Sequence, residues 1–351
     1  MPARPRLLLV ALVALGIAAA CDTGQPEPSG GSEPPSSATT EAPADGEVLA
    51  YGFEAGDVIR YEVEIEQHIV LESAGDPGAL ADGDTPQNAD VTVTAAGPFT
   101  YEVAEGPEPD TFAITVTGEF DQTTVDGAAD GEPVDDLADI ADLGVAQPVS
   151  SVVVVDRQGR ILEEGDPATD ALGLGATPLA GLTGDLGRVP GPVLSTEPVA
   201  TGSTWTETTT DAAFGDEPVE TVTEATVSGA EPLDEVDTLR IEAVSQTGRA
   251  EIDLADFFVE FMGSFTEDPE SAAALADEVV FRITVDPSSS ESTTWFDPEV
   301  GLARQVTTTG PPTAFLMEVA LPDEDTGDLQ SSELGLSVSQ SLTYRLVGGG
   351  S

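Results

Sequence analysis

Residues 58–71 read VIRYEVEIEQHIVL and decide the fold class of this chain. Apolar residues occupy nearly every second position, and charged or polar residues stand between them. Because successive side chains of a β-strand point to opposite faces, this pattern predicts one long strand with one buried and one wet face. The buried face comprises Ile59, Tyr61, Val63, Ile65, Ile69 and Leu71, and the wet face comprises Arg60, Glu62, Glu64, Glu66 and His68. Sheets that are wet on one side are normally antiparallel.

The same alternation returns in four later stretches, 112–116, 279–285, 315–321 and 334–346. Threonine and valine are enriched at 91–95, 203–210, 219–227 and 304–309, which adds further strands. Acidic loops rich in turn-forming residues separate the strands at 72–90, 127–144 and 322–333. We therefore expect a mainly β protein with one or more long, curved antiparallel sheets or an open half-barrel.

One segment, residues 253–278, departs from the strand pattern. It begins with Asp253, a suitable helix N-cap, and then places Phe257, Phe258, Phe261 and Met262 at helical spacing. Its second part is rich in alanine and is preceded by a proline. These features predict a short amphipathic helical segment that covers an apolar face of the sheet.

Two parts of the sequence resemble each other weakly, which suggests that the chain has two similar halves. Gly56 and Gly202 each precede a strand, and Asp156 and Asp297 each begin a turn that contains glycine and leads to a returning strand. Two unrelated hairpins can share such turn residues, so the sequence leaves open whether the two halves arose by duplication. The expected organisation is a signal peptide (1–20), a lipidated N-terminus and stalk (21–47), a first β half (48–165), a connector rich in Gly, Leu and Pro (166–195), a second β half with the helical insert (196–347) and a flexible tail (348–351).

The first 21 residues have the features of an export signal. Arg4 and Arg6 precede an apolar stretch, residues 7–20, that is too short to span a bilayer as a helix. Cys21, the only cysteine of the chain, follows directly. This region resembles the lipobox of bacterial lipoproteins, although Ala18 stands where that family usually has leucine. The resemblance implies that Cys21 carries lipid, becomes the mature N-terminus and holds the protein on the extracytoplasmic face of the cell membrane.

An ordinary signal peptidase site is the alternative for this region. Ala18 and Ala20 would then be its small residues, and Cys21 would remain as a free thiol near the new N-terminus. An exposed free thiol is a liability in an oxidising compartment, which favours the lipidated form.

Residues 22–47 and the overall charge describe the rest of the exported chain. These residues are rich in Pro, Ser, Gly, Thr and Glu and contain no large apolar side chain, so they predict a flexible stalk. The whole chain has 66 acidic residues against 11 basic ones and a formal charge of −55, which becomes −57 when Arg4 and Arg6 are removed. Such a surface repels nucleic acid, which we exclude as a partner. Adaptation to salt is one explanation of the acidity, and a GC-rich genome is the alternative.

Candidate residues for catalysis are few. His68 is the only histidine, it lies on the wet face of the first long strand, and no Gly-x-Ser-x-Gly motif occurs. Zinc and similar metals need His and Cys ligands, which the chain cannot supply in number. We therefore expect neither an enzyme nor a bound cofactor.

Calcium is the one metal for which a pattern exists. Asp323, Asp325 and Asp328 alternate with other residues near Gly327, which resembles the start of a calcium-binding loop. The glycine is one position early, and Leu334 stands at the twelfth place, where such loops have glutamate. An acidic hairpin loop is the alternative.

The predicted architecture loosely resembles the open half-barrels of lipoprotein carriers and glycolipid-binding lipoproteins of the cell envelope. The resemblance is one of architecture without a shared motif. It implies a non-enzymatic protein that binds a lipid or other hydrophobic ligand, with Phe257, Phe258, Phe261 and Met262 lining the cavity. The alternative is a structural or protein-interaction module of the envelope, whose sheet packs against its own chain and leaves no cavity.

Overall fold

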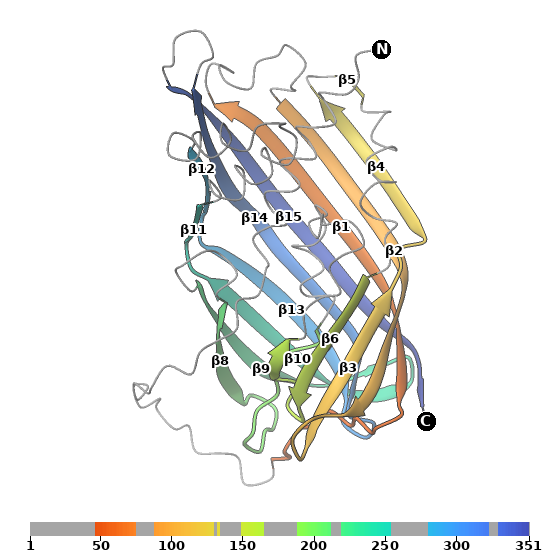
Figure 1. Ribbon diagram of the computed structural model, residues 1–351. Coiled ribbons are helices and arrows are strands. Elements are labelled where there is room, and N and C mark those ends of the chain that lie inside the picture. Colours follow the sequence, from red (N-terminus) through yellow and green to blue (C-terminus); the bar gives the residue numbers. More distant parts are fainter. Residues whose placement is uncertain are drawn as a thin grey trace, which may run out of the picture.

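The computed structural model describes residues 46–74, 88–129, 132–133, 149–164, 188–211, 219–253, 280–322 and 329–350 (Figure 1). Among these residues we find no helix with the length and apolar character that a membrane span needs. The expected helical segment 253–278 lies outside the described residues, apart from Asp253, which is the last residue of a strand.

All the strands of the described residues belong to one antiparallel sheet. They are β1 (Val58–Ala74), β2 (Asn88–Glu105), β3 (Thr111–Gly118), β4 (Gln122–Ala129), β5 (Glu132–Pro133), β6 (Val149–Asp156), β7 (Ile161–Glu164), β8 (Thr204–Asp211), β9 (Val219–Leu233), β10 (Val236–Thr247), β11 (Ala250–Asp253), β12 (Val280–Val285), β13 (Ser288–Asp297), β14 (Leu302–Pro322) and β15 (Leu329–Gly350).

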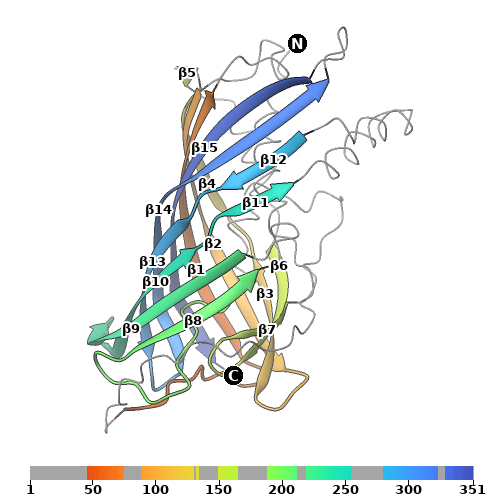
Figure 2. The same ribbon diagram turned by 90° about the vertical axis from the view of Figure 1, so that its left-hand side faces the viewer.

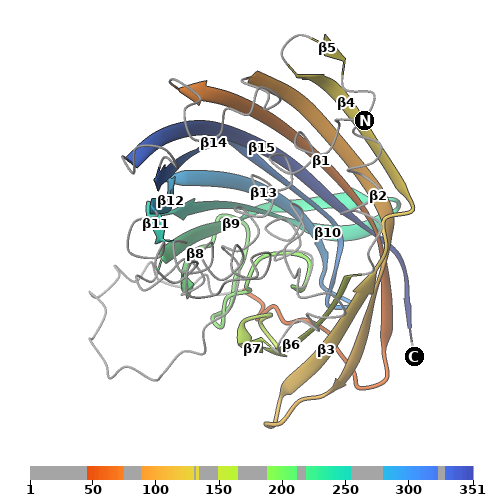
Figure 3. The ribbon, with the colours of Figure 1, turned by 45° about the horizontal axis from the view of Figure 1, so that its top comes forward.

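The first and last of these strands pair at the centre of the sheet. β1 and β15 run antiparallel from the Val58–Gly350 pair to the Ala74–Glu333 pair. From this centre the order is β2, β3, β6, β7 on one side and β14, β13, β10, β9, β8 on the other. Figures 2 and 3 show how the sheet curves, so that its two sides face each other across a concave surface. No ladder joins the edge strands β7 and β8, which confirms the long, curved, open antiparallel sheet expected from the sequence.

Two long strands change partners halfway along. β2 pairs with β4 up to Ala96 and with β3 from Phe99, and β14 pairs with β13 up to Thr309 and with β12 from Phe315. Gly97-Pro98 and Gly310-Pro311-Pro312 stand at the changes. Proline has no backbone N–H, so it interrupts a ladder on one side of a strand. We call the end of the sheet that holds Val58 and Gly350 the base. The part that lies beyond the two changes of strand partner is called the upper half.

Burial along β1 follows the alternation predicted from the sequence. Ile59, Tyr61, Val63, Ile65 and Leu71 are buried, Ile69 is half-buried, and the intervening glutamates are exposed. Gln67 lies on the same buried face and is only 5% exposed. Residues paired directly opposite each other in an antiparallel ladder share a face, so the register extends this face across the sheet. It is the concave face, since its base residues form one buried cluster with residues of both sides.

Candidate functional site on the concave face

Two segments outside the strands, 46–53 and 188–200, fill the base of the concave face. The Tyr51 ring stacks on Phe53 with ring centroids 5.2 Å apart, and its edge contact with Phe296 of β13 measures 5.7 Å. Phe53 in turn makes an edge contact with Phe112 of β3 at 5.7 Å. A void of about 10 Å³ remains beside Tyr51 and Phe53, which is at the lower limit for a single water molecule. The base is therefore a packed core that joins the two sides of the sheet.

Two similar turns hold the segment 46–53 in place. Asp156 ends β6, and its Oδ1 accepts hydrogen bonds from the N–H groups of Gln158 and Arg160 at 2.9 Å each. Asp297 ends β13, and its Oδ1 accepts from the N–H groups of Glu299 and Val300 at 3.0 and 3.2 Å. The hairpins predicted at Asp156 and Asp297 are thereby confirmed.

Two consecutive residues of the segment 46–53, Tyr51 and Gly52, each form a backbone hydrogen bond with a different one of these turns. The Tyr51 N–H donates to the Arg157 carbonyl at 2.7 Å, and the Gly52 N–H donates to the Gly301 carbonyl at 2.9 Å. Gly52 has no room for a side chain, because an added Cβ would lie 2.1 Å from the Val300 carbonyl oxygen. One short segment thus connects β6–β7 on one side of the sheet to β13–β14 on the other.

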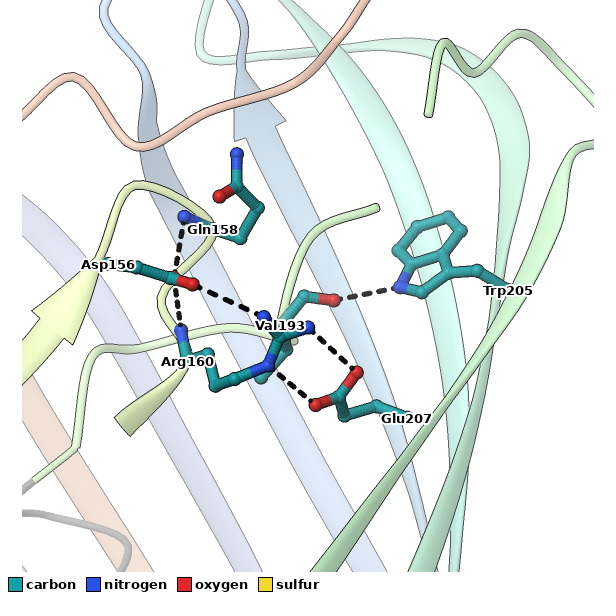
Figure 4. Close-up of polar contacts among 6 residues, drawn as sticks. All are labelled: Asp156, Gln158, Arg160, Val193, Trp205 and Glu207. Carbon is teal, nitrogen blue, oxygen red and sulfur yellow. Dashed lines mark hydrogen bonds and ion pairs between the residues drawn. The ribbon is translucent and has the colours of Figure 1, made fainter. Parts of the chain in front are cut away.

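The free edges of the sheet meet at the base through side chains (Figure 4). Arg160, in the turn before β7, forms a two-pronged ion pair with Glu207 on β8, with Nε–Oε1 at 2.9 Å and Nη2–Oε2 at 3.2 Å. Such a fork fixes both direction and distance between its partners. Hydrogen bonding to Glu207 raises the pKa of Arg160, so the guanidinium stays charged. Beside it, the Trp205 indole N–H donates to the Val193 carbonyl at 2.8 Å, which ties β8 to the segment 188–200.

Beyond the base and the paired Gln67 and Gln340, the concave face is apolar again on the central strands. Ile69 of β1 lies between Val91 of β2 and Val338 of β15 in directly paired positions. Next to them, Leu71 and Leu336 are paired and are buried, yet neither belongs to the buried cluster at the base. Apolar sheet surface is stabilised by removal from water. The apolar part of the concave face therefore continues from the base cluster into the upper half.

The predicted lipidation, ligand and metal residues lie outside the described ranges. Phe257, Phe258, Phe261 and Met262 fall between β11 and β12, Asp323, Asp325 and Asp328 fall between β14 and β15, and Cys21 precedes residue 46. Their roles stay predictions. Within the described ranges, no group of three or more His, Cys, Asp or Glu side chains is placed to hold a metal ion.

The single histidine lies on the convex face. His68 Nε2 is 2.7 Å from Asp90 Oδ1, and both side chains are largely exposed. An exposed contact of this kind adds little stability. Two features of the concave face were not predicted from the sequence. One is the Arg160–Glu207 pair, which joins the free edges of the sheet at the base, and the other is the directly paired Gln67 and Gln340.

Three buried tyrosines at the base predict sensitivity to alkali. Burial raises the pKa of Tyr51, Tyr61 and Tyr101 above the usual value of about 10. Above that pH the unfolded chain loses protons that the folded protein keeps. The contribution of these tyrosines to stability is therefore constant below about pH 9 and falls as pH rises further, by up to ~1.4 kcal/mol per pH unit for each tyrosine.

Urea unfolding between pH 8 and pH 11 measures this dependence. Tyr61→Phe removes one ionisable group, together with its 3.0 Å hydrogen bond to the Ala303 carbonyl, and is expected to reduce the slope by about a third. A free energy of unfolding that does not change from pH 8 to pH 11 contradicts the expectation.

Comparison with known proteins identifies no family. No protein-family model matches this chain, and no curated protein does. Among solved structures, it is similar to a lipovitellin chain from a study of lipid–protein interactions, with a TM-score of 0.37 and 13% identity over 85% of this chain and 26% of that chain. An outer membrane channel from Pseudomonas putida F1 gives a TM-score of 0.21 and 10% identity over 87% and 98% of the two chains. The chain spans about a quarter of the lipovitellin chain, and neither TM-score indicates a function.

Proposed function

We propose that this protein is an extracytoplasmic lipoprotein, anchored to the cell membrane through Cys21, that binds a lipid or other hydrophobic ligand without chemically changing it. The observation that most directly supports this proposal is the apolar surface that Ile69, Val91 and Val338 form on the upper half of the concave face. It continues past the packed base on three neighbouring strands. Burial of an acyl chain there contributes about 0.8 kcal/mol per methylene group, which suits a ligand with long hydrocarbon chains.

The shape of the sheet supports this proposal. The base is closed by the aromatic cluster and the Arg160–Glu207 pair, whereas no ladder joins the edges β7 and β8. A trough that is packed at one end and apolar towards the other provides a bounded surface for one elongated ligand. The predicted lining residues Phe257, Phe258, Phe261 and Met262 belong to the segment between β11 and β12, and β12 pairs with the upper part of β14.

A second function, a structural or protein-interaction module of the envelope, has one observation in its favour. The base of the concave face is filled by residues 46–53 and 188–200 of the chain itself. If the upper half is filled in the same way, the protein holds no ligand and acts through its surface. The two functions differ in whether lipid copurifies with the protein.

Ile69→Asp tests the ligand site. A charged group placed on an apolar surface costs several kcal/mol to desolvate, so we expect at least a tenfold loss of bound lipid. The measurement is solvent extraction of the purified protein followed by mass spectrometry of the extract. Val70→Asp is the matched control, because Val70 is adjacent in the strand and faces the convex side beside Ser337 and Asp90.

The unmodified protein is expected to carry about one lipid per chain, and Val70→Asp is expected to retain it. Absence of lipid from the unmodified protein, together with no uptake from detergent-solubilised lipid, supports the interaction module. Equal lipid content in Ile69→Asp and Val70→Asp contradicts the placement of the site.

A further inference from the structure

A row of polar side chains lies between the base and the apolar upper half on the strands from β8 to β1, and it ends there because Gln67 pairs with Val93 on β2. On the central strands it contains Gln67 and Gln340, which are paired directly opposite each other. The row continues over the second side of the sheet, where the register aligns one residue from each strand in turn. We call the following residues the polar belt: Gln67 on β1, Gln340 on β15, Ser290 on β13, Ser245 on β10, Thr223 on β9 and Glu207 on β8.

The register places the belt as one line. Ser245 pairs with both Ser290 and Thr223, and Thr223 pairs with Glu207. Gly310 of β14 connects the two parts, because it pairs with Gln340 and an added Cβ there would lie 3.9 Å from Ser290 Cβ. The belt therefore crosses the sheet from the edge strand β8 to β1.

The alternation of each strand places the belt on the concave face. Gln67 lies two positions from the buried Ile65, and Ser245 lies two positions from the buried Ala243. The neighbours of Ser245 in sequence, by contrast, are exposed. Gln67 is the most buried member at 5% exposure, and the others are half-buried. An amide that is removed from water is stabilised only when it has hydrogen-bond partners.

The belt is nearly free of net charge. Its only ionised member, Glu207, is held by the guanidinium of Arg160. The hydroxyl groups of Thr223 and Ser245 are 2.8 Å apart and bond to each other, and each hydroxyl keeps further hydrogen-bonding capacity. The glutamines supply amide donors and acceptors. Such groups suit hydroxyl, ester or amide groups of a ligand, whereas a phosphate finds no uncommitted cation among them.

We propose that the polar belt binds the uncharged, hydrogen-bonding head of an amphiphile whose hydrocarbon chains lie along the upper half. This inference rests on the proposed function, because it assigns the polar end of the same ligand. The head lies against Gln340 and the half-buried hydroxyls of Ser290 and Ser245, below the apolar pair Ile69 and Val338. The belt selects against anionic head groups, since Glu207 and the acidic surface around it disfavour them.

A displacement assay with lipids of identical chains tests the selection. The neutral apolar dye N-phenyl-1-naphthylamine reports occupancy of the hydrophobic surface, and dioleoylglycerol and dioleoyl phosphatidate compete with it. The assay is run in 0.5 M salt, so that long-range repulsion of phosphatidate is screened to within roughly 4 Å. Dioleoylglycerol is expected to displace the dye at about tenfold lower concentration, the difference that one or two buried hydrogen bonds supply.

The variant Gln67→Leu/Gln340→Leu separates the belt from the apolar surface. It is expected to bind the dye as before and to lose the preference for dioleoylglycerol to within about twofold. His68→Leu/Ser339→Leu is the matched control, because His68 and Ser339 are paired next to the glutamines on the convex face. Thr223→Val is a second arm, since it removes a belt hydroxyl while keeping the shape of the side chain.

The outcomes distinguish the belt from the proposed function. Failure of the unmodified protein to bind the dye or either lipid overturns the proposed function. Dye binding with equal displacement by both lipids overturns the belt inference and leaves the proposed function standing. A preference that survives in both Gln67→Leu/Gln340→Leu and Thr223→Val also overturns the belt inference.

Discussion

Asp297→Ala is expected to lower the free energy of unfolding by about 3–5 kcal/mol, because it breaks a buried ion pair and opens a turn in one step. The Asp297 side chain is 3% exposed, and its Oδ2 accepts from Arg304 Nη2 at 2.7 Å and Nε at 3.0 Å. Its Oδ1 accepts from two backbone N–H groups of the turn. Alanine leaves Arg304 without its carboxylate and both N–H groups without an acceptor.

The equivalent change on the other side of the sheet is the control. Asp156 occupies the same place in the β6–β7 hairpin, but its side chain is 20% exposed and its Arg160 partner keeps the contact with Glu207. Asp156→Ala is therefore expected to cost only about 1–2 kcal/mol. Urea unfolding of both variants at pH 7 gives the comparison. Equal losses in the two variants would show that burial of Asp297 adds nothing, contrary to the expectation.

Cys21→Ser is expected to release the protein from membranes almost completely. Two acyl chains give stable attachment, since each buried methylene contributes about 0.8 kcal/mol, whereas the remaining chain repels anionic membranes through its acidity. Cell fractionation in low and high salt measures the distribution, and labelled palmitate measures acylation. The unmodified protein is expected to incorporate label and to sediment with membranes in both conditions.

A comparison with Ile69→Asp, which keeps Cys21, separates anchoring from ligand binding. Ile69→Asp is expected to remain with membranes although it loses lipid from the concave face, because Cys21 is unchanged. If Cys21→Ser still sediments with membranes and the unmodified protein takes up no palmitate, the anchor proposal is wrong. The signal peptidase alternative, with Ala18 and Ala20 as its small residues, then accounts for the N-terminus.

Many of the strands were predicted from the sequence, but β10 (Val236–Thr247) was not, and neither was the full extent of the long strands. The alternation in 58–71 predicted β1 and its buried face, and burial confirms both. The sequence separates 304–309 from 315–321 at Gly310-Pro311-Pro312, whereas β14 runs through all of them. The prolines mark a change of partner, because the loss of an N–H affects one side of a strand while the other side keeps its ladder with β15.

The candidate site was less accessible from the sequence. Gln67 occupies the buried face in a run of apolar residues, which a single-sequence pattern treats as an interruption. Its significance depends on Gln340, which the ladder between the first and last strands places opposite it. Arg160 and Glu207 likewise come from separate hairpins and meet only where the free edges of the sheet approach each other at the base.

By itself, the sequence determined that the chain is mainly β, which face of β1 is buried, the turns at Asp156 and Asp297 and the expectation of lipid on Cys21. Each of these depends on residues within a few positions of one another, where side-chain alternation and turn chemistry act. The tertiary structure alone decided that the base is filled, that Arg160 joins the free edges and that the polar belt forms one line. Strand order and register set these neighbours, and both depend on the summed free energy of the whole sheet, which no local pattern encodes.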